Sequence, residues 1–168
     1  MIRILRQIFR TGIVTEPLQP DLDREIREVG ARLEEAIRKK FRGSLAIRQV
    51  DAGSCNGCEL EIHAMNNPIY NCERFGMHFT ASPRFADLLL VTGPVTQNME
   101  IALKRTYNAT PDPKLVVAVG DCGCSGGIFG QSYASLGGID KVIPVDACIA
   151  GCPPTPTALL NGILKAIS

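Results

Sequence analysis

After Gly43 the chain alternates short aliphatic segments with helical segments, and this alternation limits the possible folds more than any other feature. The aliphatic segments predict strands over Leu45–Val50, Ala86–Thr92, Leu115–Gly120 and Lys141–Asp146. Helices are predicted around Glu59–Met65, Gln97–Tyr107 and Pro156–Ile167. Thr155 and Pro156 suit the N-cap and first position of the last helix. The pattern indicates an α/β fold, a parallel sheet with helices on both faces.

The first 43 residues differ from the rest and are predicted to form an N-terminal arm and an amphipathic helix, before a domain over residues 44–168. From Asp21 to Arg42 the apolar residues follow one helical stripe: Leu22, Ile26, Val29, Leu33, Ile37 and Phe41. In the first twelve residues, apolar and basic side chains alternate at helical spacing. This short segment is either an amphipathic helix that lies on a membrane or a partner, or an arm with scattered arginines.

Composition excludes several classes of protein. The chain has 168 residues, of which 45% are hydrophobic, enough for the core of one domain. A net charge of +1 argues against nucleic-acid binding. No apolar run approaches the roughly 20 residues that span a bilayer. The first ten residues have no apolar export signal and no twin-arginine pair, so we expect a cytoplasmic protein.

The chain contains seven cysteines, an odd number that suits metal or redox chemistry better than a set of disulfides. They gather with glycines in three loops that follow predicted strands: Gly53–Cys58, Gly120–Gly127 and Gly151–Pro154. Ligand sites of open parallel sheets lie at the carboxyl ends of the strands. We therefore expect these loops to meet, and their glycines allow backbone amides to approach an inorganic cluster.

Four cysteines stand out as candidate ligands of an iron-sulfur cluster. Cys55 and Cys58 form a Cys-x-x-Cys pair, Cys122 is nearest a strand end, and Cys152 precedes a proline, as in bacterial cluster motifs. A zinc site and a redox dithiol at the pair are the alternatives. The zinc reading lacks a second tight pair, and the dithiol reading leaves two cysteines unexplained.

The other three cysteines receive different roles. Cys124 and Cys148 lie beside the predicted site and are either additional thiols around a cluster, alternative ligands or small packed residues. Cys72 precedes the second predicted strand, away from this edge of the sheet, and is expected to be structural.

Several segments together resemble the small subunit of [NiFe] hydrogenases and its relative in respiratory complex I. The resemblance rests on the three cysteine loops and on Glu73–Gly76, Ser82–Leu90, Thr92–Thr96 and Pro144–Asp146. It covers residues 44–168 and is greatest to the formate hydrogenlyase type of membrane-bound hydrogenase. Complex I relatives carry two adjacent cysteines in the first motif, whereas Asn56 and Gly57 separate the pair in this chain.

The resemblance implies a flavodoxin-like domain that holds one [4Fe-4S] cluster through Cys55, Cys58, Cys122 and Cys152. The cluster would be proximal to the nickel-iron site of a partner large subunit and would relay electrons for proton reduction or hydrogen oxidation. Further expected partners are a ferredoxin-like iron-sulfur subunit and membrane-arm subunits, which place the chain peripherally on the cytoplasmic face of the inner membrane. The alternative is a complex I-like subunit that passes electrons to quinone.

Two acidic residues, Glu59 and Glu61, follow the Cys-x-x-Cys pair, where carboxylates favour a helix N-terminus. The alternative for Glu61 is a contact with the large subunit or a proton route near the metal site. Asp121 and Ser125 flank Cys122 and are candidates for ordering its loop or for hydrogen bonding to the cluster sulfurs.

Overall fold

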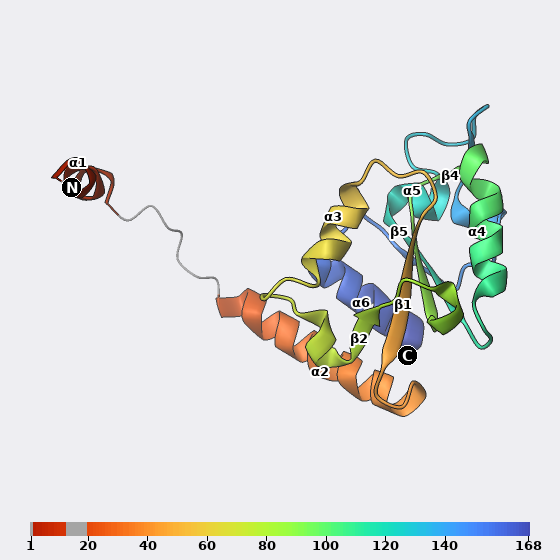
Figure 1. Ribbon diagram of the computed structural model, residues 1–168, viewed down its shortest axis with the longest axis horizontal. Coiled ribbons are helices and arrows are strands. Elements are labelled where there is room, and N and C mark those ends of the chain that lie inside the picture. The colour runs from red at the N-terminus through yellow and green to blue at the C-terminus, as the bar shows by residue number, and fades with distance from the viewer. Residues whose placement is uncertain (1, 13–19) are drawn as a thin grey trace.

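A five-stranded parallel sheet forms the centre of the computed structural model, which describes residues 2–12 and 20–168 (Figure 1). Its strands, in spatial order, are β2 (Met77–Phe79), β1 (Leu45–Asp51), β3 (Leu88–Thr92), β5 (Leu115–Val119) and β7 (Ala147–Ile149). Every neighbouring pair is parallel. Counted among these parallel strands alone, the order is 2-1-3-4-5, the flavodoxin-like order. The predicted fold class is confirmed.

Helices cover both faces of the sheet, as predicted. The first hydrophobic cluster joins the sheet to α2 (Pro20–Lys40), α3 (Gly57–Ala64) and α6 (Pro156–Ile167). The second cluster lies on the opposite face, with α4 (Gln97–Ala109) and α5 (Gly120–Ser125). Strand β1 alternates between them, since Leu45 and Ile47 belong to the first cluster and Val50 to the second.

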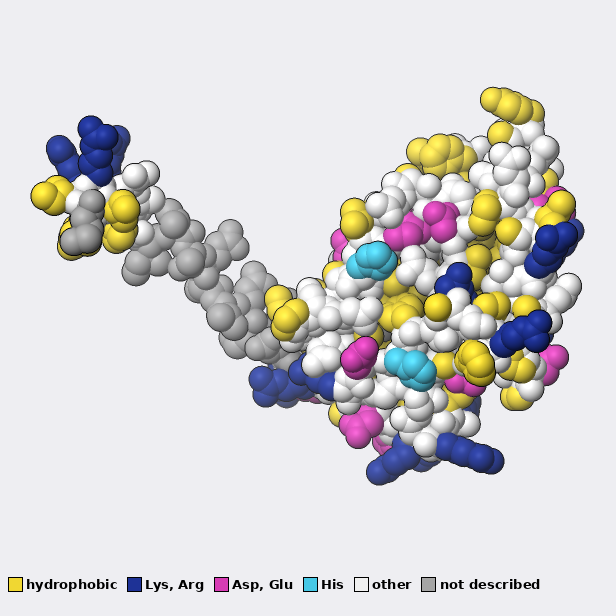
Figure 2. Space-filling view, viewed as in Figure 1, with side chains coloured by type: hydrophobic (Ala, Val, Ile, Leu, Met, Phe, Trp, Pro, Cys, Tyr) yellow, Lys and Arg dark blue, Asp and Glu magenta, His cyan; other side chains and the backbone are white. Residues whose placement is uncertain are grey.

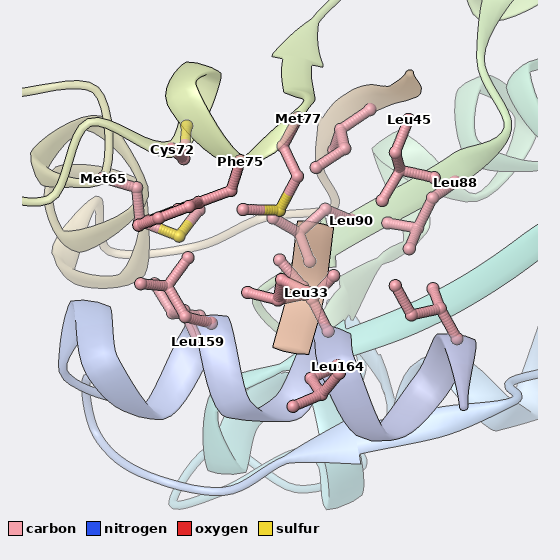
Figure 3. Packing of buried hydrophobic residues seen from close by; sticks show 14 of the residues in the cluster. Leu33, Leu45, Met65, Cys72, Phe75, Met77, Leu88, Leu90, Leu159 and Leu164 are labelled. Carbon is pink, nitrogen blue, oxygen red and sulfur yellow. The ribbon is translucent and has the colours of Figure 1, made fainter. Parts of the chain in front are cut away.

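The α6 helix contributes Leu159 and Leu164 to the first cluster and packs against α2 and β7 (Figure 3). Thr155 caps α6, because its side-chain oxygen accepts a hydrogen bond from the Ala158 N–H at 3.3 Å. Both the bounds and the cap of this helix match the prediction.

The apolar stripe of α2 is buried at Ile26, Val29, Leu33 and Ile37. The helix ends before Gly43, whose φ of 97° favours glycine. The stripe packs in the same cluster as β1 and α6. Helix α2 therefore contributes to the core of the cysteine-bearing domain, and the boundary at residue 43 stays a prediction.

The predicted strand Lys141–Asp146 is wrong. This segment contains the end of a 3-10 turn (Ile139–Lys141) and a loop, and the strand follows at Ala147–Ile149. Pro144 lacks an N–H for a strand ladder, and the Asp146 carboxylate accepts a hydrogen bond from the Val116 N–H at the start of β5, at 2.7 Å. The apolar residues that suggested a strand instead cover the second cluster.

Several short elements carry too little periodicity to be predicted. The edge strand β2 has three residues, and β4 (Val95–Thr96) pairs with β6 (Ser135–Gly137) in a small antiparallel sheet. The 3-10 turns η1 (Cys72–Phe75) and η2 (Pro83–Phe85) flank β2.

The first segment of the chain is helical, as α1 (Ile2–Thr11). Proline cannot continue a helix, so the sequence predicts a break at Pro17, which lies outside the described residues. Among the helices of residues 2–12 and 20–168, none is both long and apolar enough to cross a membrane.

Candidate metal centre

The three cysteine loops meet at one cavity of about 150 Å³ beyond the carboxyl ends of the strands. Its walls come from the loops after β1, β3, β5 and β7, and they are formed by Ser54, Cys55, Gly57, Cys58, Gly93, Asp121, Cys122, Gly151, Cys152 and Pro153. The four cysteines singled out in the sequence are thus brought together from positions up to 97 residues apart. The topology explains this convergence, because parallel strands all end at the same edge.

Two aspartates hold the loops in place. The Asp51 carboxylate accepts hydrogen bonds from the Gly53 and Ser54 N–H groups, both at 2.8 Å. The Asp121 carboxylate accepts one from the Gly151 N–H at 2.9 Å, and the Asp121 N–H donates to the Gly151 carbonyl, also at 2.9 Å. Asp121 therefore joins the loop that carries Cys122 to the loop that carries Cys152.

Glycines leave room for the thiols. Gly120 has a φ of 78°, and a Cβ at this position would lie 2.7 Å from Cys58 Sγ. Gly127 has a φ of 53°, and its Cβ would lie 2.8 Å from Cys122 Sγ. A side chain at either position would strain the backbone and push on a cysteine.

The thiols and nearby acids form an electronegative site. Burial raises the pKa of the Cys58 thiol to about 11, and the charges of Glu59 and of the other three cysteines add to the rise. Burial, then Cys152, Cys55 and Asp121, raise the pKa of the Cys122 thiol. Four thiolates around one cavity repel one another, so their ionised forms need a strongly positive centre between them.

The donor set fits an iron-sulfur cluster better than a zinc ion. Tetrahedral zinc with Zn–S bonds near 2.3 Å requires sulfur atoms about 3.8 Å apart. The four thiols surround a cavity that is roughly ten times what a water molecule requires. Thiols spread around such a space suit a multinuclear centre.

Glu59 is a feature of the site that its sequence position did not reveal. The residue is only 5% exposed, and neither carboxylate oxygen has a hydrogen-bond partner within the described residues. It follows Cys58 and lies on the same side of α3 as the buried Ile62, three residues on. The three-residue spacing between Glu59 and the apolar Ile62 was the sequence signal that Glu59 is buried. From the sequence alone the opposite is expected, because an acidic residue in the first turn of a helix is usually solvated.

The remaining candidates lie outside the cavity wall. Glu61 is half-buried on α3. Cys124 is hydrogen-bonded to the Ala118 and Ile149 carbonyls, and burial followed by a hydrogen bond with Cys148 raises its pKa to about 12. Cys148 is exposed. Neither Cys124 nor Cys148 lines the cavity.

Two further sequence expectations concern residues near the site or in the core. Cys72 is fully buried in the first cluster, and its thiol donates to Asn66 Oδ1 at 3.0 Å, as expected for a structural cysteine. The Ser125 hydroxyl donates to the Asp121 carbonyl at 3.0 Å, so this serine does help to order the Cys122 loop.

Fold and site together define a class of protein: a flavodoxin-like domain with a cysteine-lined centre at the carboxyl edge of its sheet. More particularly, the chain belongs to the family described as NADH ubiquinone oxidoreductase, 20 Kd subunit, which matches residues 55–166. The relationship expected from the cysteine motifs is thereby confirmed.

Relatives include both hydrogenase and complex I subunits. The chain is 47% identical to formate hydrogenlyase subunit 7 of Escherichia coli over 82% of its own length. It is also 47% identical to a probable membrane-bound hydrogenase subunit of Pyrococcus furiosus, over 81% of this chain and 83% of the relative. An NADH-quinone oxidoreductase subunit of Heliobacterium modesticaldum is 47% identical over 64% of this chain and 62% of its own length.

A solved archaeal complex contains a similar chain. In the membrane-bound sulfane sulfur reductase, one chain matches with a TM-score of 0.66 and 41% identity, over 81% of this chain and 73% of that chain. The present chain spans only about half (54%) of formate hydrogenlyase subunit 7. The relatives are subunits of oxidoreductase complexes, and two of these complexes are described as membrane-bound.

Proposed function

We propose that this chain is the electron-transfer small subunit of a membrane-associated [NiFe] hydrogenase complex. Cys55, Cys58, Cys122 and Cys152 would hold a single [4Fe-4S] cluster, proximal to the nickel-iron site of the large subunit. The observation that carries the proposal is that these four thiols, from three separate loops, line one cavity. The chain alone is inactive in this proposal, because the hydrogen-activating metals belong to the partner.

A bound cluster would supply one-electron chemistry, and the residues of this chain define its surroundings. The four thiols ligate it, and Gly120 and Gly127 leave space for two of them. Asp121 keeps the Cys122 and Cys152 loops together. Pro153 covers one wall with an apolar surface. Such a partly enclosed site limits reorganisation when an electron arrives or leaves, which suits a relay.

The hydrogenase branch is favoured over the complex I branch by two observations. Two residues, Asn56 and Gly57, separate the first pair of cysteines, which are adjacent in the complex I type. The hydrogenase relatives match about four fifths of this chain, whereas the NADH-quinone oxidoreductase relative matches 64%. A quinone-reducing, complex I-like role is the second candidate.

The partner subunits and the location of the chain follow from its proposed role as a hydrogenase small subunit. Partners would be the large subunit, a ferredoxin-like iron-sulfur subunit and membrane-arm subunits, with the chain peripheral on the cytoplasmic face. The names of two relatives, which describe membrane-bound complexes, support the association with a membrane.

The test is an anaerobic pull-down of the tagged chain from its native host, with iron, nickel and zinc measured in the complex and hydrogen turnover assayed with a viologen. We expect iron, about one nickel per complex and hydrogen turnover. Iron without nickel would replace the proposal with the complex I-like role, and zinc alone would overturn the cluster.

Substitutions test the ligands separately from the complex. Cys55→Ser should abolish hydrogen turnover and reduce the iron content of the complex, because a serine hydroxyl replaces a thiolate ligand. The matched control is Cys148→Ser, since this exposed cysteine lies outside the cavity wall and should leave both unchanged. Full iron content and turnover in Cys55→Ser would contradict the ligand assignment.

A further inference from the structure

Helix α1 has an apolar face and a basic face that the fold does not use. At about 100° per residue, its five apolar residues fall within an arc of about 160°, and its three arginines within an arc of about 60° beside it. The apolar residues are Ile2, Ile4, Leu5, Ile8 and Phe9, and the basic ones are Arg3, Arg6 and Arg10. Figure 2 shows the arginines gathered on one side of this helix and the hydrophobic side chains on the others.

The apolar face is open within the described chain. No residue of α1 is buried. Phe9 is 86% exposed and Ile2 is 82% exposed, and the other three apolar side chains are each more than half exposed. A contiguous apolar surface of this kind marks a site of contact with another apolar phase. A helix this short is also marginal alone in water, so a contact on this face would stabilise it.

The charge of α1 indicates the chemistry of its partner. The ten residues contain three arginines and no acidic residue. An anionic surface therefore complements the basic arc while the apolar arc enters a hydrophobic layer. The surface of a bilayer that contains anionic phospholipids offers the negative charge and the hydrophobic layer side by side. A protein groove usually takes a narrower stripe at positions i, i+3, i+4 and i+7, whereas this apolar arc is nearly half of the helix circumference.

We propose that α1 lies in the plane of an anionic bilayer surface. Ile4, Leu5, Ile8 and Phe9 enter the boundary between headgroups and acyl chains, and Arg3, Arg6 and Arg10 contact the lipid phosphates. A ten-residue helix is about 15 Å long, half of the hydrocarbon thickness, so it lies on the membrane rather than across it. This inference is independent of the cluster, because no part of the metal centre is involved.

A single fluorophore can report the insertion, because the chain contains no tryptophan. The full chain with Phe9→Trp is mixed with vesicles of phosphatidylethanolamine and phosphatidylglycerol in a 3:1 ratio, and with vesicles of phosphatidylcholine. We expect a blue shift and protection from iodide only with the anionic vesicles. The matched probe Gln7→Trp lies outside the apolar arc and should remain open to the quencher.

Co-sedimentation with the same vesicles separates charge from apolar contact. Replacing Arg3, Arg6 and Arg10 with glutamine should weaken binding about a hundredfold, since each basic residue near an anionic surface contributes about fivefold. The same change at the exposed residues Arg27, Arg32 and Arg38 on α2 controls for net charge and should have little effect. Ile4→Asp with Ile8→Asp should abolish binding, whereas Ile101→Asp, at an exposed position of α4, should not.

The proposal is overturned if the full chain does not bind anionic vesicles, or if the α1 and α2 arginine variants bind equally. It is also overturned if the α1 variants lose association with partner subunits while vesicle binding is unchanged, because the helix is then a protein contact. None of these results bears on the iron content of the chain, so failure here and failure of the relay function are distinguishable.

Discussion

Two glycines of one loop allow the position of the Cys122 thiol to be tested with a matched pair of substitutions. Gly127 and Gly130 have nearly equal φ values of 53° and 52°. An alanine at either position has a similar backbone cost of about 1–2 kcal/mol. Both variants should therefore lose about 2–8 °C in melting temperature. Only their surroundings differ, because nothing lies within 4 Å of a Cβ at Gly130.

A Cβ at Gly127 would lie 2.8 Å from Cys122 Sγ and 3.1 Å from the Cys122 Cα and N atoms. An ordinary contact requires about 3.8 Å, so the thiol or the loop must move by about 1 Å. Ligands of a metal centre tolerate deviations of about 0.2 Å. Gly127→Ala should therefore lower iron content and visible absorbance strongly, whereas Gly130→Ala should retain both.

The assay is iron and sulfide analysis of the anaerobically purified complex, together with thermal unfolding. Comparing the two variants removes the shared backbone strain and leaves the contact with Cys122. Equal iron content in Gly127→Ala and Gly130→Ala would refute the reasoning, since the centre would then not depend on where this thiol lies.

Three further substitutions examine other parts of the site and the fold. Glu59→Gln replaces a buried carboxyl group next to Cys58 and should raise the midpoint potential of the cluster by tens of millivolts in an EPR-monitored titration. An unchanged or lower potential would contradict an electrostatic influence of Glu59 on the cluster. Asp121→Ala removes the bond to the Gly151 N–H and should lower the free energy of unfolding by about 1 kcal/mol and iron content in part, measured by denaturation and metal analysis. Thr155→Ala removes the cap of α6 and should lower the free energy of unfolding by about 1 kcal/mol and the melting temperature by about 2–4 °C, with unchanged iron content. Equal iron loss in Thr155→Ala and Asp121→Ala would argue that Asp121 acts through general stability alone.

Sequence reasoning located the cysteine site because that site depends on topology. Once strands and helices alternate, the carboxyl ends of the strands share one edge, so Cys122 and Cys152 are expected together although 30 residues separate them. The same reasoning placed Cys72 away from the edge, where the structure buries it.

Sequence reasoning failed where an element was short or served a tertiary role. Strands of two or three residues, such as β4 and β2, contain no measurable period. The alternation in Lys141–Asp146 reflects side chains that cover a core cluster, and a strand produces the same alternation. One pattern with two possible causes cannot be assigned without knowing what it packs against.

By itself the sequence determined the long helices, three of the strands, the parallel α/β architecture and the four cysteines of the candidate site. These depend on local propensity, on periodicity and on a topological rule. Only the tertiary structure decided that Cys124 and Cys148 lie off the cavity, that Glu59 is buried without a partner among the described residues, and that a Cβ at Gly127 would collide with Cys122. Burial and distance are set by how separate elements pack, and packing distances between residues remote in the chain are not encoded in any local pattern.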